Sequence, residues 1–553
     1  MSSISTRRWL ASALLTSLVL TSLIFGQTAP PAVASLSSVE DSIRQNVTVA
    51  AIKETTTALS ADDMQGRGTG QPGGDKAANW IADKFKSLGL KPAGDKGSYL
   101  QKVDFKETTV QETSFKIGEE SLSFGSDYAL VTENNGNKDV SGSLVFVSYG
   151  IQSKSNNIDM LDGVNLSGKI VILTQGPPPG IAEKQWNDQK FGQAIRRNIF
   201  AQQPAAILSI GDGRDNEHPP EEAINYMSRR QLSLPDEQGY PEGFPPILYV
   251  STKGAEKIFA AAGTTLKDAL TKGATREFKA MDLKSKARII AKYKTSKVTS
   301  NNVAGYLEGS DPTLKEEAVL FSAHYDAYGT ENGKIYHGAA DNALGVGEMM
   351  AVAEAFSKMQ QRPKRSLVFL AVTGEEYGLY GSKHWARDPT WQIKKVSADL
   401  NLDGIGSEVY GPVKTMVGYG AEYSTLGGML TDLAKTMSLN VIPDPMPDEK
   451  VFLRSDHYSF VERGVPSLML LGAPDGDKQI WIDKIKAWEK TDYHMPEDTI
   501  RDNWVWEGPE TVAEVMGILG WRISEMSGMP SWIESSRFGK LQRGNTKELP
   551  PEP

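Results

Sequence analysis

The sequence predicts an α/β fold, with helices over a mostly parallel sheet, that a smaller β-rich domain interrupts. After Ser300, short apolar runs alternate with amphipathic segments, which is typical of strands and helices that follow one another along the chain. From about 130 to 280, short apolar runs lie close together between Gly, Pro and Asn residues, which is typical of a small β-rich domain. At 553 residues the chain is also too long for one hydrophobic core, so two or three domains are expected.

The first 34 residues have the pattern of an export signal. Arg7 and Arg8 precede an apolar run at 9–25, and Ala32-Val-Ala34 is a small-x-small cleavage sequence. We therefore expect a signal peptide at 1–34, cleavage after Ala34, and an exported protein in the periplasm or the extracellular space. Two alternatives stay open: an uncleaved membrane anchor, and a twin-arginine rather than a general export signal. No later stretch is long and apolar enough to span a bilayer, so no stable membrane association is expected after cleavage.

The segment 35–129 is expected to be the N-terminal part of the main domain. Helices are predicted at 38–59 and 76–88, and in the second of them apolar residues recur at helical spacing. The glycines at 66–74 invite a dinucleotide-binding interpretation. We reject it because no apolar strand precedes them.

The segment 130–280 is predicted as an inserted β-rich domain, and no candidate catalytic cluster lies in it. The stretches 177–180 and 218–240 read as long irregular loops, with His218 as a loop residue. The predicted strands are 143–147, 169–173, 205–209 and 246–250, and the predicted helix is 190–201.

The segment 281–538 is predicted as the main α/β domain, followed by a charged, Pro-rich tail at 539–553 that is expected to be disordered. The predicted strands are 318–322, 366–372, 398–402 and 466–471, and the predicted helices are 343–360, 377–386, 424–438 and 510–526.

Composition narrows the classes of function. The net charge of −9 argues against a nucleic-acid partner, because phosphate binding needs a basic surface. The chain has no Cys, so disulfides and thiolate metal sites are excluded, and a metal ion must be held by His, Asp and Glu.

Five short segments each carry a metal ligand or an adjacent acid, and most of them follow a predicted strand. The carboxyl ends of strands in an α/β sheet meet at one edge, so these side chains are expected to converge. Together they supply two imidazoles and several carboxylates, which suit a pair of zinc ions. The segments are 322–326 (Ser-Ala-His-Tyr-Asp), 340–342 (Ala-Asp-Asn), 374–376 (Gly-Glu-Glu), 401–404 (Asn-Leu-Asp-Gly) and 493–494 (Tyr-His).

Residue chemistry assigns a role to each ligand. Two zinc ions about 3.5–4 Å apart need one shared carboxylate, for which Asp341 is the candidate. His324 and Asp403 would complete one metal ion. Glu376 and His494 would complete the other.

Adjacent residues in an extended segment point in opposite directions, so Glu375 is free to act as general base while Glu376 binds metal. The carboxylate of Asp326, two residues after His324, is placed to hydrogen-bond its imidazole. Of the remaining histidines, His337 and His384 lie in no such motif. The Asp456-His457 pair is expected to be structural, with an additional ligand pair as the alternative.

These motifs resemble the bacterial leucyl aminopeptidase and aminopeptidase Y group of co-catalytic zinc exopeptidases. The resemblance covers 64–88 and 301 to about 521. It rests on five motifs in order, ending in Tyr-His-Met-Pro-Glu-Asp-Thr at 493–499. It implies a zinc exopeptidase fold, with helices on both faces of a mixed, mostly parallel sheet, and two zinc ions per chain. It also implies that the Asp341–Asn342 peptide is cis and that Tyr493 hydrogen-bonds the oxyanion.

By the same resemblance, the β-rich segment is expected to be a protease-associated domain. The predicted activity is a metallo-aminopeptidase that cleaves peptides by means of a metal-bridging water and Glu375, with Glu375 or Asp403 holding the substrate amine. Carboxypeptidase or dipeptidase action, a single-zinc glutaminyl cyclase and a non-enzymatic scaffold of transferrin-receptor type stay open. Cobalt or manganese would also suit the ligands. Met446, Phe452, Met469 and Leu471 are expected either to pack in the core or to line a substrate pocket.

Overall fold

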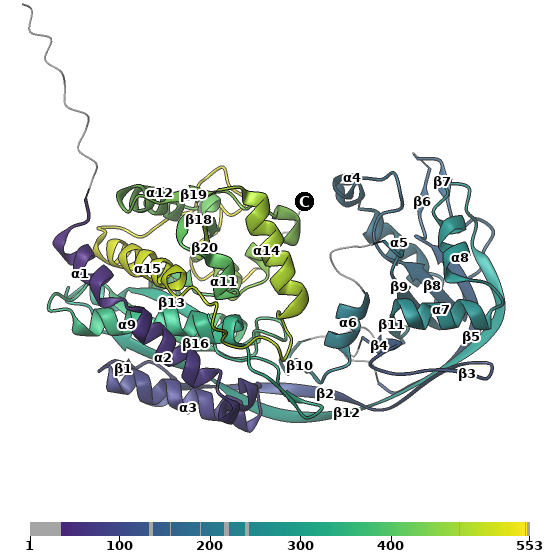
Figure 1. The fold of residues 1–553 in the computed structure, drawn as a ribbon, viewed down its shortest axis with the longest axis horizontal. Helices are drawn as coiled ribbons and strands as arrows, with labels where there is room; N and C mark the ends of the chain where they lie inside the picture. The colour runs from purple at the N-terminus through teal and green to yellow at the C-terminus, as the bar shows by residue number, and fades with distance from the viewer. Residues whose placement is uncertain are drawn as a thin grey trace, which may run out of the picture. The chain divides into compact units, whose positions relative to one another are not determined.

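The computed structural model of the chain describes residues 35–131, 136–154, 156–188, 190–214, 220–237, 243–474, 476–547 and 549 (Figure 1). The predicted signal peptide at 1–34 and His218 lie outside these residues. Residues from Leu36 onward form one compact unit.

A mixed, mostly parallel sheet with helices on both faces confirms the predicted fold class. β13 pairs in parallel with β16 and β17, and β17 pairs in parallel with β20, whereas β18–β20 and β12–β16 are antiparallel. In the order of the sheet the strands are β19 (Asn440–Ile442), β18 (Val413–Tyr419), β20 (Ser467–Pro474), β17 (Val396–Asn401), β13 (Ala318–His324), β16 (Ser366–Val372) and β12 (Met281–Leu307).

The two faces of the sheet bury alternate residues of the same strands, because side chains in a strand alternate between the faces. In β13, Val319 and Phe321 join the larger core, and Leu320 joins a smaller core on the opposite face. The larger core is covered by α1 (Ser38–Asn46), α2 (Val49–Leu59), α9 (Gly345–Lys358) and α15 (Glu507–Glu525), and the smaller by α10 (Tyr380–Arg387) and α13 (His457–Val461).

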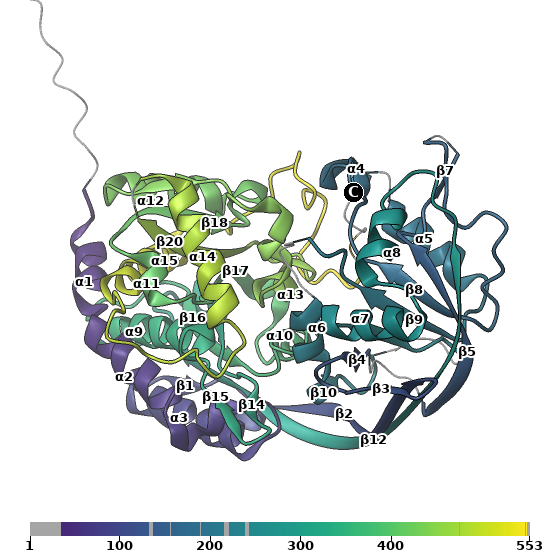
Figure 2. The same ribbon diagram turned by 45° about the vertical axis from the view of Figure 1, so that its right-hand side comes forward.

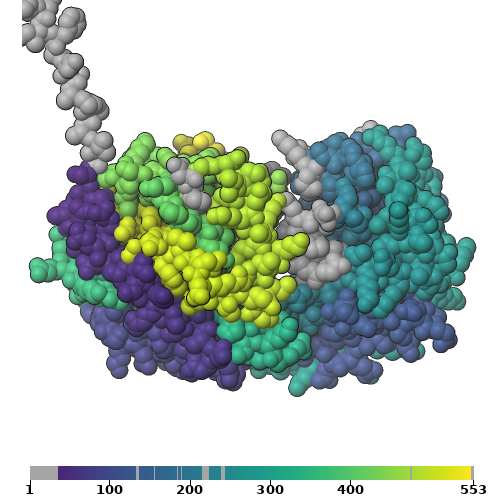
Figure 3. All heavy atoms as spheres, in the orientation of Figure 1, coloured from purple at the N-terminus to yellow at the C-terminus, as the bar shows by residue number. Residues whose placement is uncertain are grey.

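The first and the last helix of the described chain pack together on the larger core. α1 lies against α15, and the Arg522 Nε to Glu40 Oε1 ion pair of 2.5 Å joins them. In Figure 3 the purple N-terminal helices accordingly border the yellow C-terminal segment. α12 (Leu426–Thr436) and α14 (Lys478–Thr491) complete the helices around this part of the sheet, as Figure 2 shows.

One long strand joins the main core to a second core. β12 pairs with β16 through Val303–Leu307 and with β5 (Lys138–Ser148) through Met281–Ala291. It also pairs with β2 (Leu100–Ile117) along most of its length. The sequence did not predict β2 or β12, because the middle of this pair is partly exposed and carries charged residues that give no apolar run.

The second core is formed by buried residues between Phe115 and Ala291, and all of the strands named below except β4 lie where the sequence predicted them. Its likeness to a protease-associated domain, and boundaries at 130 and 280, stay predictions. The strands are β5, β8 (Ile170–Thr174), β9 (Ala206–Ile210), β11 (Ile247–Val250) and β4 (Tyr128–Leu130), and the helices include α5 (Phe191–Phe200), α7 (Thr252–Ala261) and α8 (Leu266–Gly273).

Three local predictions were wrong. The stretch 218–240, expected to be irregular, contains α6 (Pro220–Met227) and β10 (Gln231–Ser233), which pairs with β2. The helix predicted at 76–88 is present as α3 (Pro72–Ser87), but its predicted start was wrong: it begins at Pro72, since proline suits the first helical position. The tail expected to be disordered from 539 is tied down at Arg543, which donates to backbone carbonyls of Val396, Ser397 and Pro530.

Candidate metal centre

The predicted ligands converge at the carboxyl ends of the parallel strands. His324 is the last residue of β13, and Glu375 and Glu376 follow β16 by a few residues. Asp403 follows β17 in the same way. Asp341 lies in the turn before α9, and His494 lies in the loop after α14. The Asp341–Asn342 peptide is cis.

Two groups of candidate ligands share Asp341. In the first, His324 Nε2 lies 3.1 Å from Asp341 Oδ1 and 3.4 Å from Asp403 Oδ1. In the second, His494 Nε2 lies 3.4 Å from Asp341 Oδ2 and 3.0 Å from Glu376 Oε2. The two oxygens of one carboxylate therefore face two separate sets of donors.

These distances fit zinc. A tetrahedral ion with bonds of 2.0–2.1 Å separates its ligand atoms by about 3.3 Å. The four separations above are 3.0–3.4 Å. The buried Glu376 Oε2 also has no hydrogen-bond donor among the described residues. Two dications would balance the four carboxylates of Asp341, Glu375, Glu376 and Asp403 that crowd here.

The electrostatics of the cluster are those of charged ligands at close quarters. Burial raises the pKa of Asp341, but the imidazoles of His324 and His494 outweigh burial and hold this pKa below its usual range. Burial, followed by the charge of Asp341, raises the pKa of Glu376. For His494, burial lowers the pKa, but Glu376 and Asp341 outweigh it and raise the pKa to about 9.

Glu375 stands apart from both groups of ligands. Its Oε2 lies 3.9 Å from His324 Nε2, beyond the separations found among the ligand atoms. Burial is the largest influence on this carboxyl and raises its pKa well above the usual value. A carboxyl with a raised pKa, close to the metal ligands but outside them, has the properties of a general base.

Buried side chains behind the ligands hold them in place. For His324 the predicted partner was the Asp326 carboxylate, but the hydrogen bond is made by the Asp326 backbone: His324 Nδ1 lies 3.2 Å from the carbonyl oxygen and 3.7 Å from the carboxylate. The Asp326 carboxylate accepts from Thr69 Oγ1 at 3.1 Å and from the Glu375 backbone N–H at 3.2 Å. Asp326 therefore links His324 to Glu375.

Sequence reasoning missed two supports of the second group. The Asp498 carboxylate accepts the backbone N–H groups of Ala340 and Asp341, at 2.9 and 3.0 Å. It lies in the 493–499 motif, four residues after His494. Tyr328 Oη lies 3.2 Å from His494 Nδ1, and the ring is 1% exposed.

The Asp456-His457 pair belongs to neither group of ligands. The His457 ring is fully buried and packs against Phe452 with 5.0 Å between ring centroids. Burial lowers the pKa of His457 to about 4. These contacts agree with the structural interpretation.

An apolar pocket of about 100 Å³ opens directly onto the first group of ligands and Glu375. Met446, Met469 and Leu471 line it, whereas Phe452 packs against Tyr423 and other aromatic rings. Arg454 and Tyr493 also line it, and the Tyr493 ring stacks on His494 with 3.6 Å between ring centroids. Ile405, Val451, Ile485 and Trp488 complete the wall.

Comparison with known proteins finds a family model that is similar to this part of the chain. Residues 302–518 match the model described as Peptidase family M28. That range contains every candidate ligand, together with Glu375, Asp326 and Tyr493.

Two solved structures have the same fold. An aminopeptidase from Aneurinibacillus sp. strain AM-1 is 21% identical, with a TM-score of 0.58 over 89% of this chain and 97% of that one. BSAP, a zinc aminopeptidase from Bacillus subtilis, is 16% identical, with a TM-score of 0.54 over 90% of this chain and 99% of that one. At these identities the likeness is one of fold.

Curated relatives contradict the predicted location. A "Vacuolar membrane protease" of Clavispora lusitaniae is 37% identical over 20% of this chain and 10% of its own length. Another, of Candida albicans, is 27% identical over 37% of this chain and 21% of its own length. The chain thus spans a small part of these relatives. Their names point to a vacuolar membrane, so the prediction of a periplasmic or extracellular protein was wrong. None of the helices in the described part of the chain is long and apolar enough to cross a membrane.

The five motifs, the convergent ligands and the family match agree. Residues 302–518 are therefore similar to Peptidase family M28, and the convergent ligands in that range suit a zinc centre.

Proposed function

We propose that the chain is an aminopeptidase that holds two zinc ions and removes single residues from the N-termini of peptides. The aminopeptidase names of both structural neighbours and the protease names of the relatives support this proposal. The two groups of donors that share Asp341 support the zinc count.

In this proposal His324, Asp403 and Asp341 hold one ion, and Glu376, His494 and Asp341 hold the other. Zinc bound there would act as a Lewis acid that polarises the scissile carbonyl. The chain's own residues do the remaining work.

Glu375 takes a proton from the attacking water and passes it to the leaving amine. Its raised pKa suits both transfers. Tyr493 donates its hydroxyl hydrogen to the oxyanion. Burial is the main reason that the pKa of Tyr493 lies well above its usual value, so the hydroxyl keeps its proton. Asp326 orients His324.

The observation that carries the proposal is the apolar pocket beside the ligands. Carboxylates of Glu375 and Asp403 are among the residues that line it, and they would pair there with a free α-ammonium group. An engineered apolar cavity of about 150 Å³ holds benzene, so a pocket of about 100 Å³ suits one aliphatic side chain. A single N-terminal residue such as leucine is therefore the expected unit of cleavage.

Arg454 favours one second candidate, a carboxypeptidase or dipeptidase of the same fold. Its guanidinium lies at the same pocket, where a substrate carboxylate would pair with it. The Glu449 carboxylate, 3.6 Å from Arg454 Nη1, weakens this alternative because it already balances that charge.

A panel of aminoacyl-p-nitroanilides separates the candidates. The aminopeptidase proposal expects chelator-sensitive cleavage of free-amine substrates with a preference for aliphatic residues, and no cleavage of their N-acetylated counterparts. Cleavage of N-acylated dipeptides with a free carboxylate would support the carboxypeptidase instead.

A further inference from the structure

The segment 220–237, which contains α6 and β10, reaches into the metal centre. α6 and β10 belong to the stretch that was expected to be an irregular loop. β10 joins a small core with Phe105 and Tyr328. Before β10, Tyr226 Oη donates to the Glu376 carbonyl at 3.5 Å, and Asn225 Nδ2 donates to Met495 Sδ at 3.4 Å. Of the two residues contacted, Glu376 is a candidate ligand and Met495 is adjacent to the candidate ligand His494.

Arg229 makes the most direct of these contacts. Its Nη2 donates to the backbone carbonyl of His494 at 2.9 Å. The guanidinium lies between two rings, with its carbon 4.0 Å from the centroid of Tyr328 and 4.5 Å from that of Tyr336. The Arg229 side chain therefore fixes both the backbone of His494 and the ring of Tyr328, whose hydroxyl lies 3.2 Å from the His494 imidazole.

The backbone of His494 needs such support. Its φ is +58°, in the left-handed region that residues with a side chain rarely adopt. Such a conformation persists only where the surroundings impose it. Arg229 holds the carbonyl of this residue, and Asp341 and Glu376 face its ring.

Core packing alone does not account for Arg229. The residue is 6% exposed, and its Nε and Nη1 have no hydrogen-bond partner among the described residues. A buried cation with unmet donors costs free energy. An apolar side chain would fill the space between the two tyrosines without this cost, so the guanidinium is explained by what it holds.

The next residue serves as an internal contrast. Arg230 Nη2 donates to the Thr69 carbonyl at 2.6 Å, and Thr69 Oγ1 donates to Asp326 behind His324. Arg230 is thus connected to the group of ligands that contains His324, and only through Thr69 and Asp326.

We propose that Arg229 is a positioning residue for His494. Through Arg229, the segment 220–237 completes the zinc subsite of Asp341, Glu376 and His494. This inference rests on the proposed two-zinc function. It makes the segment 220–237 a component of the metal centre as well as a neighbour of it.

The test measures zinc release and does not depend on activity. The purified protein, loaded with zinc, is mixed with a chromophoric chelator, and the number of ions released and their rates are recorded. Arg229→Met keeps the unbranched stem between the tyrosines and removes the donors. We expect one ion to be lost about 10–100-fold more readily than in the wild type, and the other to be unchanged. Arg229→Lys keeps the charge but loses the planar fork, so its rate of zinc release should lie between those of the wild type and Arg229→Met.

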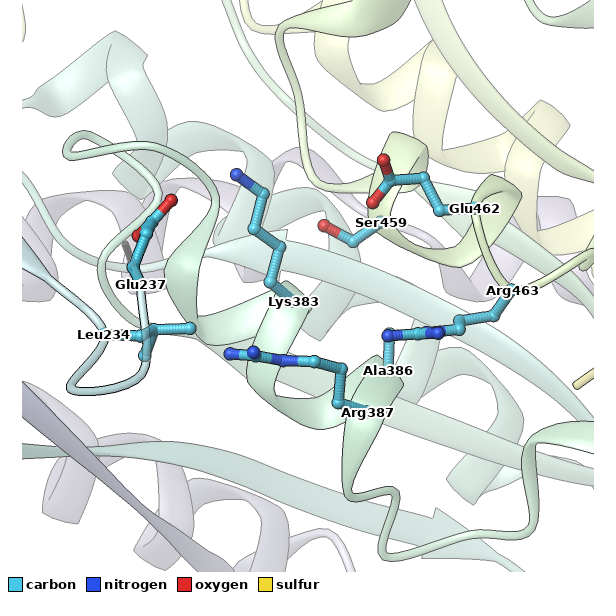
Figure 4. A pocket seen from close by; sticks show the side chains of 8 residues that line it. All are labelled: Leu234, Glu237, Lys383, Ala386, Arg387, Ser459, Glu462 and Arg463. Atoms are coloured by element: carbon cyan, nitrogen blue, oxygen red, sulfur yellow. The ribbon is translucent and has the colours of Figure 1, made fainter. Parts of the chain in front are cut away.

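Arg387→Met is the matched control. Arg387 pairs with Asp236 at 2.7 Å, which is another contact of the segment 220–237 with the main domain. Arg387 also lines a cavity with Leu234, Glu237 and Lys383 (Figure 4). Its zinc release should match the wild type. Adding Arg229→Met to Glu376→Gln should not weaken the remaining ion, because both substitutions act on one subsite.

The outcomes separate the two proposals. Fewer than two ions in the wild type would overturn the two-zinc function. Two ions in the wild type with unchanged release from Arg229→Met would overturn the role of Arg229 alone, as would an equal effect in Arg387→Met. If Arg229→Met does not fold, Arg229→Lys decides: release at the wild-type rate overturns the inference, and faster release of one ion supports it.

Discussion

The adjacent glutamates give the sharpest prediction, because the structure separates two residues of the same type. Glu376 Oε2 lies 3.0 Å from His494 Nε2, which fits two ligands of one zinc ion. Glu375 Oε2 lies 3.9 Å from His324 Nε2, outside that range. Replacing either with glutamine keeps the shape of the side chain and removes its charge, so the two variants should fail in different ways.

For Glu375→Gln we expect full zinc content and a loss of kcat. Removing a general base costs about 10²–10⁴-fold. At about 1.4 kcal/mol for each tenfold, this is about 2.8–5.6 kcal/mol of transition-state stabilisation. Glu376→Gln instead removes a ligand, and the amide that replaces it is a poor donor to zinc. The purified variant should therefore hold one ion where the wild type holds two.

The assay combines metal analysis with steady-state kinetics on leucyl-p-nitroanilide. The KM of Glu375→Gln should stay within a few-fold of the wild type, since the substitution leaves the apolar pocket intact. Loss of one zinc ion from Glu375→Gln, or activity above a tenth of the wild type, would refute the division of roles between the two glutamates.

Three further predictions concern the surroundings of the centre. Asp498→Asn leaves one of two buried backbone donors without an acceptor, so urea denaturation should show a loss of about 1–3 kcal/mol, and unchanged stability would refute the support of Asp341. Met469→Trp fills the apolar pocket, so kcat/KM should fall more for leucyl than for alanyl substrates; an equal fall would argue that the pocket holds no side chain. Burial, followed by the charge of Glu510, raises the pKa of Glu514 to about 7. The charged form is thus destabilising, and this cost grows as the pH rises from about 4.5 through 7. Glu514→Gln should raise Tm at pH 8 and leave it unchanged at pH 4; the same Tm change at both pH values would contradict this.

The main sheet and the ligands could be predicted because both leave local signals. β16 is a continuous apolar run, since a strand buried on both faces has no polar side. The ligands stand directly after such runs, at His324, Glu376 and Asp403. Because the carboxyl ends of parallel strands meet at one edge of the sheet, the convergence of these residues can be predicted without knowing how the loops fold.

The parts that could not be predicted depend on contacts between distant segments. β12 carries alternating polar residues whose pairing with β2 appears only in the folded chain. Arg229 stands 265 positions before His494, in a stretch that carries no strong periodic pattern. A charged residue in such a stretch gives no sign that folding will bury it between two tyrosines.

The location was predicted wrongly for a different reason. The pattern at 1–34 lies outside the described residues, and an apolar run near the lower length of a span is compatible with either an export signal or a membrane anchor. Relatives named for a vacuolar membrane contradict the periplasmic or extracellular prediction.

The central claim is that two zinc ions bound by the shared Asp341 support cleavage at a free N-terminus. It is tested most directly by titrating zinc into the metal-free chain while following hydrolysis of leucyl-p-nitroanilide and of its N-acetyl derivative. The account predicts that activity reaches its maximum at two ions per chain, and only with the free-amine substrate. Full activity at one ion, or equal cleavage of the acetylated substrate, would contradict it.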